Sequence, residues 1–131
     1  MDAPRFVKRV AELSGLDREH AERTIRATLV TLGTRIDPGE ADDLAAQLPD
    51  WLGACLPHEG HAERFKPEEF ARRVARLVPL HNDQAVPAIR AVFTVLEEAV
   101  SEGEMRQVRA QLGHEYERLV GAPTGQHATA G

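Results

Sequence analysis

The sequence predicts an all-α fold, a six-helix bundle made of two three-helix repeats that are related by a pseudo-two-fold axis. Three observations lead to this prediction. When residues 6–52 are laid over residues 70–116, 16 of the 47 pairs are identical, whereas composition alone would give roughly 4. Apolar residues recur at helical spacing in both copies. No alternating run of β-branched residues bounded by turn residues predicts a strand.

The first helix of each repeat is predicted from its apolar spacing. Phe6, Val10 and Leu13 recur at i, i+4 and i+7, and Gly15 follows as a stop signal. The equivalent stripe of the second repeat is Phe70, Val74 and Leu77. We expect both stripes to face the core.

The second helix of each repeat is predicted to be the central packing element. The first copy spans about residues 18–36, and both copies carry an apolar stripe one helix face wide. The second copy contains Pro87, which lacks a backbone donor and clashes with the preceding turn. We therefore expect that helix to be kinked or to start after the proline.

The third helix of each repeat has a start signal that reads as a capping box. In both copies a cap residue, Asp37 or Ser101, is followed three positions later by Glu40 or Glu104. The cap side chain is expected to accept from the glutamate amide, and the glutamate to reach back to the cap amide. The domain boundaries that follow are one helical domain over 1–121 (repeat one 2–56, linker 57–65, repeat two 66–120) and a flexible tail over 122–131.

Composition places the chain among soluble globular domains. It has 131 residues, a formal net charge of −5, 42% hydrophobic residues and one cysteine, so it has no internal disulfide framework. No apolar run is long enough for a membrane span or a signal peptide, which predicts a cytoplasmic protein without a membrane partner. Neither half is basic, so a nucleic-acid partner is not expected.

The repeated pattern resembles a known family of small bacterial proteins. The segments that carry the resemblance are Ile25-Arg26-Ala27 with Gly39-Glu40-Ala41 and Ala46-Gln47-Leu48-Pro49, and in the second repeat Ile89-Arg90-Ala91, Gly103-Glu104 and Ala110-Gln111-Leu112. The family is a conserved, internally duplicated domain of unknown function. The resemblance covers about residues 6–119 and implies an all-helical fold and a bacterial cytosolic origin, but no activity.

The linker holds the candidate metal ligands Cys55, His58 and His61. Thiolate and imidazole are ligand types that zinc takes, and this segment has no counterpart in the second repeat. The alternative is a half-buried Cys55 that completes the core, with two solvated histidines. Three ligands spaced this closely in sequence can bind one ion only if the loop folds so that all three side chains face it.

Arg26 and Arg90 are candidate anion ligands, because both repeats place an arginine in the middle of an apolar central helix. If the two guanidinium groups met across the pseudo-two-fold axis, they would clamp a phosphate or carboxylate. The alternative is architectural: each arginine would tie its helix to Glu40 or Glu104, or bind backbone carbonyls.

Function is predicted mainly by exclusion. No catalytic or cofactor-binding motif occurs, so we expect no cofactor and do not predict an enzyme; an active site built on Glu40 and Glu104 is conceivable, but capping explains both residues. The hypothesis is a non-enzymatic protein-interaction or regulatory module, with a partner-binding patch at Trp51, Leu52 and Leu56 if these side chains are exposed. The alternative is a metal- or small-anion-binding protein. The oligomeric state stays open.

Overall fold

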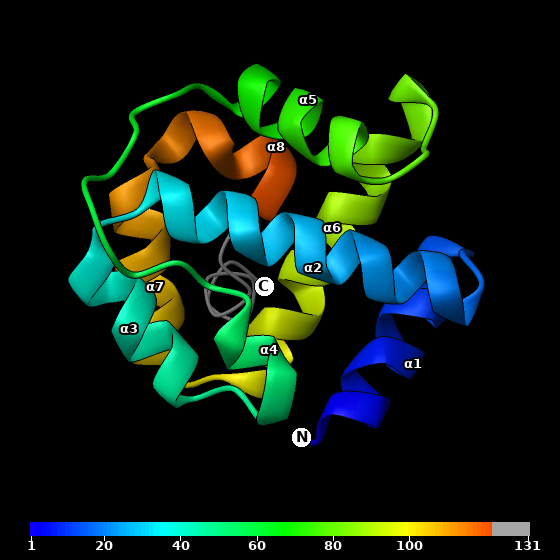
Figure 1. Ribbon diagram of the computed structural model, residues 1–131, viewed down its shortest axis with the longest axis horizontal. Helices are drawn as coiled ribbons and strands as arrows, with labels where there is room; N and C mark the ends of the chain where they lie inside the picture. The colour runs from blue at the N-terminus through cyan, green and yellow to red at the C-terminus, as the bar shows by residue number, and fades with distance from the viewer. Residues whose placement is uncertain (122–131) are drawn as a thin grey trace, which may run out of the picture.

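The computed structural model describes residues 1–121 and is all-helical (Figure 1). These residues form eight α-helices and one 3₁₀ turn, and no strand, so the all-α class is confirmed. In chain order the elements are α1 (Ala3–Ser14), α2 (Arg18–Arg35), α3 (Pro38–Ala46), α4 (Asp50–Ala54), α5 (Pro67–Leu77), α6 (Asn82–Ala99), α7 (Glu102–Leu112), η1 (His114–Tyr116) and α8 (Glu117–Val120). Within the described part of the chain, no helix has the length and apolar character needed to cross a bilayer. The expected tail, 122–131, lies outside the described residues.

Local signals fix the ends of the first two helices. The Asp2 side chain accepts a hydrogen bond from the Arg5 amide at 2.9 Å, and Asp17 caps α2 in the same way through the His20 amide at 2.8 Å. Gly15 ends α1 with a φ of 77°, a left-handed conformation that glycine adopts without strain.

Of the two alternatives for α6, a kink or a later start, the later start is wrong. The helix begins at Asn82, and the side-chain oxygen of Gln84 accepts from the His81 amide at 3.0 Å, which stabilises this early start. Pro87 therefore lies inside the second turn. It is exposed, so the carbonyl that loses its amide partner can be solvated.

The central helices α2 and α6 pack against each other, with α2 crossing the front of the molecule in Figure 1 and α6 behind it. Each also receives the first helix of the other half, since α1 packs on α6 and α5 packs on α2. This interleaving builds one continuous core. The side chains with no exposed surface at its centre include Phe6, Val10, Ile25, Leu29, Phe70, Val74, Ile89 and Phe93.

Leu13 and Leu77 are not in this core, which corrects the prediction that they complete the buried stripes of α1 and α5. Leu13 is 43% exposed and Leu77 is 59% exposed. The residues that they face on the neighbouring central helix are short: Ala91 beside Leu13, and Ala27 beside Leu77. Short side chains leave a hollow at each place, so the leucines stay uncovered.

The second half ends with two elements that the sequence analysis did not predict. After α7 the chain turns through η1 and continues as α8, which packs on α6. This turn buries Tyr116 edge-on against Phe70, with ring centroids 5.9 Å apart. Aromatic pairs in this geometry stabilise a core beyond the area that they bury.

Gly33 is the point where the linker crosses α2, and it gives a first prediction. A Cβ atom at this position would lie 2.8 Å from the Pro57 nitrogen and 2.9 Å from its carbonyl oxygen. Backbone cannot yield as a flexible side chain can, so Gly33→Ala should lower the free energy of unfolding by about 2–3 kcal/mol. Gly39→Ala is the control, because no atom lies within 4 Å of a Cβ there. Urea denaturation of both variants measures the effect. Equal stabilities would show that the Pro57 backbone does not pack closely on Gly33.

Candidate functional site

A reciprocal pair of glutamine contacts joins the N-terminus of α3 to the C-terminal end of α7, and the N-terminus of α7 to the C-terminal end of α3. Gln47, at the end of α3, accepts from the Ser101 amide at 2.8 Å and donates to the Ser101 hydroxyl at 3.3 Å. Gln111, on α7, accepts from the Asp37 amide at 2.9 Å and donates to the Asp37 carboxylate at 3.0 Å. Each glutamine thus holds the cap residue of the opposite helix.

These contacts correct the prediction of two capping boxes. The Ser101 hydroxyl does accept from the Glu104 amide at 3.1 Å, but the Asp37 side chain makes no cap hydrogen bond. The glutamates do not reach back in either copy, because the cap amides are already bonded to the glutamines. Glu40 and Glu104 are therefore released from the role that sequence analysis assigned to them.

The released glutamates meet each other. Glu40, Asp43 and Glu104 form a carboxylate cluster in which one oxygen from each residue lies within 4.8 Å of the others. Glu40 and Asp43 are one helical turn apart on α3, and Glu104 comes from the facing first turn of α7. The cluster runs from an exposed carboxylate, Asp43, to a buried one, Glu104, which is 8% exposed.

The charges in the cluster are not balanced by basic side chains. Among the described residues, no lysine or arginine forms an ion pair with any of the three carboxylates. Oε2 of Glu40 and Oε2 of Glu104 are buried without a hydrogen-bond partner. Burial, and then the neighbouring Glu40 and Asp43, raise the pKa of Glu104 to about 8. Such a group holds a proton at neutral pH or needs a cation.

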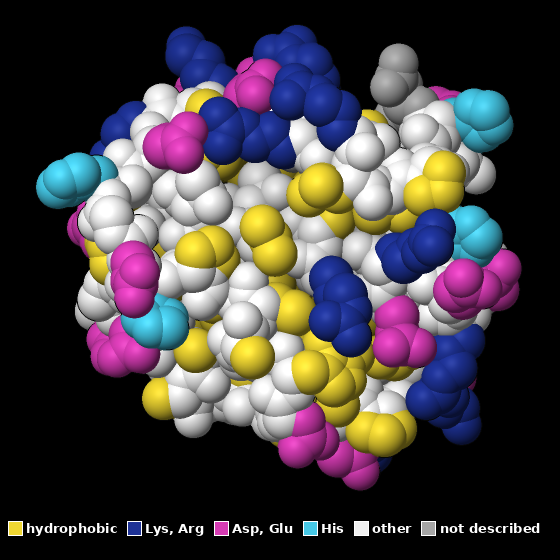
Figure 2. Space-filling model, in the orientation of Figure 1, with side chains coloured by type: hydrophobic (Ala, Val, Ile, Leu, Met, Phe, Trp, Pro, Cys, Tyr) yellow, Lys and Arg dark blue, Asp and Glu magenta, His cyan; other side chains and the backbone are white. Residues whose placement is uncertain are grey.

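Two surface hollows form a second candidate site. We call them the α2–α5 hollow, lined by Arg23, Arg26, Ala27, Val30 and Leu77, and the α1–α6 hollow, lined by Leu13, Val86, Pro87, Arg90, Ala91 and Thr94. Figure 2 shows hydrophobic side chains together with Lys or Arg side chains on the face that α2 crosses. Four positions of the first hollow align with four of the second at an offset of 64 residues, and the exposed leucines 13 and 77 align in the same way.

The predicted anion ligands lie in these hollows. Arg26 lines one and Arg90 lines the other, so the structure does not place them in one clamp. The Arg26 guanidinium stacks over Trp51, with its central carbon 4.3 Å from the ring centroid. Neither arginine pairs with Glu40 or Glu104, so the architectural alternative is not found in that form.

The predicted metal ligands are not brought together. Among the described residues, the carboxylate cluster forms a group of three potential ligands, and Cys55, His58 and His61 do not. The Cys55 thiol donates to the Trp51 carbonyl at 3.2 Å, and burial raises its pKa, an effect that nearby Arg26 partly offsets. His58 and His61 are both exposed. The geometry matches the alternative of a half-buried cysteine beside solvated histidines.

The predicted partner patch is mostly covered. Leu52, on α4, has no exposed surface, and Leu56, which follows the end of α4, is 2% exposed. Trp51 is half-buried beneath Arg26. This patch was predicted on the condition that its side chains are exposed, and only Trp51 meets that condition, in part. Leu13, Val30 and Leu77, which line the two hollows, are more exposed than any residue of the patch.

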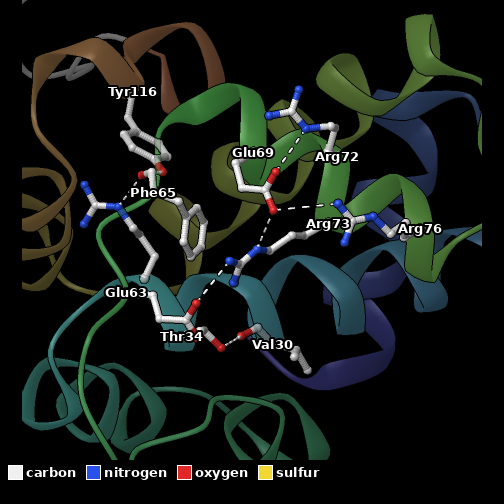
Figure 3. Close-up of polar contacts among 10 residues, drawn as sticks. Val30, Thr34, Glu63, Phe65, Glu69, Arg72, Arg73, Arg76 and Tyr116 are labelled. Atoms are coloured by element: carbon white, nitrogen blue, oxygen red, sulfur yellow. Dashed lines mark hydrogen bonds and ion pairs between the residues drawn. The ribbon is translucent and has the colours of Figure 1, made fainter.

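The linker before α5 is anchored by charged and aromatic contacts (Figure 3). Glu69 on α5 binds Arg72 and Arg73, both at 3.0 Å, and these hydrogen bonds hold its pKa below the usual value. Arg73 also binds Glu63 at 3.1 Å and stacks on the Phe65 ring at 3.9 Å. Arg72 and Arg73 are therefore engaged by neighbouring side chains.

A residue that sequence analysis missed completes this anchor. Arg35, at the end of α2, is 6% exposed and donates from Nε to the Phe65 carbonyl at 2.8 Å. Its other nitrogens donate to the carbonyls of Gln111 and Leu112, each at 3.3 Å. The aligned position of the second half is Ala99, so the repeat pattern carried no signal for this arginine.

Comparison with known proteins identifies the family of this chain. No curated protein matches the chain. A family model described as "Uncharacterized conserved protein (DUF2267)" matches residues 3–119, a span that includes the carboxylate cluster and both hollows. The match covers most of the chain, and the protein therefore belongs to this uncharacterised conserved family.

Proposed function

We propose that the protein is a non-enzymatic protein-interaction module of the bacterial cytoplasm, and that each hollow binds an amphipathic helix with an acidic side chain next to an apolar one. One observation carries the proposal. The same recognition elements, an exposed leucine and an arginine on a floor of small side chains, occur in both hollows at aligned positions. This equivalence also favours an internal duplication with a pseudo-two-fold axis.

The apolar part of the partner is inferred from the exposed leucines. Leu77, at 59%, and Leu13, at 43%, are among the most exposed large apolar side chains of the described chain, and each lies beside a hollow rather than on a convex surface. Val30, 39% exposed, adds to the first hollow. A helix that laid a leucine or phenylalanine into either hollow would remove this surface from water.

The acidic part is inferred from charge. Among the described residues, the side chains of Arg23 and Arg90 contact no carboxylate, and the Arg26 guanidinium stacks on an indole instead of an acid. The overall charge of the protein is −5, and these arginines place a local positive charge at the two hollows. A carboxylate on the partner would form charge-assisted hydrogen bonds with them and orient the helix in the hollow.

Selection of binding peptides tests the proposal. A library of helical peptides displayed on phage is selected against the wild-type protein. We expect the enriched sequences to carry Asp or Glu three or four positions from a large apolar residue. Their affinity should fall at least tenfold for Leu77→Asp or Arg26→Glu when they occupy the α2–α5 hollow, and for Leu13→Asp or Arg90→Glu when they occupy the α1–α6 hollow.

Two controls make the result specific. Arg106→Glu makes the same charge change on the exposed face of α7 and should leave affinity unchanged. A peptide whose acidic residue is replaced by lysine should bind the arginine-to-glutamate variant better than it binds wild type. The proposal is wrong if no peptide is enriched, or if the enriched peptides bind both leucine-to-aspartate variants as tightly as wild type.

A further inference from the structure

We propose that Glu40, Asp43 and Glu104 bind one hard divalent cation, of the class Mn²⁺, Mg²⁺ or Ca²⁺, between α3 and the first turn of α7. This site is separate from the two hollows, and its existence does not depend on the function proposed for them. The cation would join two helices whose ends the glutamine contacts already hold together, the N-terminus of each at the C-terminal end of the other.

The geometry supplies three ligands from two helices. One oxygen from each carboxylate lies within 4.8 Å of the others, so modest side-chain rotation brings all three onto one ion. Glu40 and Asp43 share a helix face, and Glu104 approaches from α7. Asp43 is exposed, which leaves one side of the site open for the water molecules that Mg²⁺ and Ca²⁺ retain.

A buried, unpartnered carboxylate distinguishes this site from an ordinary acidic surface. The Glu104 side chain is more than nine-tenths buried, and its Oε2 atom has no hydrogen-bond partner. Oε2 of Glu40 is in the same state. The Glu104 carboxyl can share its proton with Glu40. When Glu104 is ionised, neither oxygen has a donor among the described residues, and a cation is the ligand that would satisfy both.

The ligand chemistry selects the class of cation. The cluster offers carboxylate oxygens only. Hard cations prefer such oxygen ligands, whereas zinc and copper favour imidazole or thiolate. Three carboxylates give the site a large negative charge once they are ionised. Among the described residues no lysine or arginine offsets this charge, so a divalent cation is the natural counter-ion.

Thermal unfolding with added chloride salts tests the site. In metal-free buffer at pH 8.5, addition of Mn²⁺, Mg²⁺ or Ca²⁺ at ten times its dissociation constant should raise the melting temperature of wild type by about 5 °C. Asp43→Asn should lose most of this shift because it removes one of the three ligands. Without cation its melting temperature should be no lower than that of wild type, since Asp43 is exposed and loss of its charge relieves repulsion with Glu104. Glu104→Gln should lose the shift although the fold itself is stabilised.

Asp42→Asn is the matched control. Asp42 is exposed, precedes Asp43 and is not part of the cluster, so this variant should keep the full cation shift. Titration calorimetry of wild type with Mn²⁺ should show one cation bound per chain, and Asp42→Asn should bind it equally well. The proposal is overturned if wild type shows no shift at pH 8.5 with 20 mM salt, or if Asp43→Asn and Asp42→Asn respond alike.

Discussion

Glu104→Gln is expected to stabilise the protein by about 4 kcal/mol at pH 8.5 in cation-free buffer, because it replaces a buried carboxyl that ionises by an amide that does not. The ordinary pKa of a glutamate is near 4.5, and in the folded protein burial and the carboxylates of Glu40 and Asp43 raise it to about 8. Ionisation of Glu104 therefore destabilises the folded state. Glutamine has nearly the same shape and never ionises.

The pH range of the effect follows from these two pKa values. The folded state holds the Glu104 proton more tightly than the unfolded state, so this group contributes its full stability below pH 4.5. That contribution is lost progressively as pH rises from 4.5 to 8. The stability difference between Glu104→Gln and wild type should thus be small at pH 4.5, grow through the neutral range and level off above pH 8.

Urea denaturation at a series of pH values measures this difference. Asp17 and Glu69 have lowered pKa values, so they give the opposite trend in acid, but both proteins contain them and their effects cancel in the difference. Glu102→Gln is the control, because it removes a charge from the same helical turn at an exposed position. If the difference in free energy of unfolding between Glu104→Gln and wild type did not change with pH, Glu104 would not be buried beside the Glu40 carboxylate as described.

The sequence was sufficient to predict features that depend on local rules. The ends of α1 follow from Asp2 and Gly15, which act on backbone within four residues of themselves. The buried stripes at Phe6, Val10 and their counterparts follow from helical periodicity. These rules need no knowledge of which helices meet.

The carboxylate cluster could not be predicted because its cause is non-local. The cap rule correctly pairs Ser101 with the Glu104 amide, but it also assigns the glutamate side chains to the cap amides. Those amides are instead bonded by Gln47 and Gln111, which are 54 and 74 residues away along the chain. The identity of both glutamines in the two copies was visible in the sequence, and their contacts explain it only once α3 and α7 are placed.

The two leucines show the same limit in a different way. Leu13 and Leu77 have the correct spacing for burial, and periodicity alone cannot tell a covered position from an open one. Their exposure depends on the small side chains that they face on α6 and α2. The exposure of these two leucines, which best supports a binding function, is therefore a feature that helical periodicity predicts incorrectly.

Arg35→Ala should lower the free energy of unfolding by about 3 kcal/mol, a large effect for removal of one arginine. Arg35 donates to the carbonyls of Phe65, Gln111 and Leu112, and its guanidinium lies 5.0 Å from the centre of the Tyr116 ring. Alanine would leave buried acceptors at the C-terminus of α7 without a donor, and each unsatisfied group costs about 1–3 kcal/mol before relaxation.

Two further variants separate the possible causes of this loss. Arg64→Ala removes an arginine from the same linker region, but that side chain is 62% exposed and pairs with Asp37 only at 3.5 Å, so it should cost less than 0.5 kcal/mol. Arg35→Lys keeps the charge and loses the planar fork, and it should recover only a minor part of the stability.

Fluorescence of Trp51, the single tryptophan, reports the unfolding of all three variants in urea. The second half lacks an equivalent of Arg35, since Ala99 occupies the aligned position. The linker that Arg35 holds also occurs once, because the chain has one connection between its halves. If Arg35→Ala and Arg64→Ala were equally stable, the three carbonyls would be satisfied without Arg35, and the linker anchor would have to lie in Arg73 and Tyr116 instead.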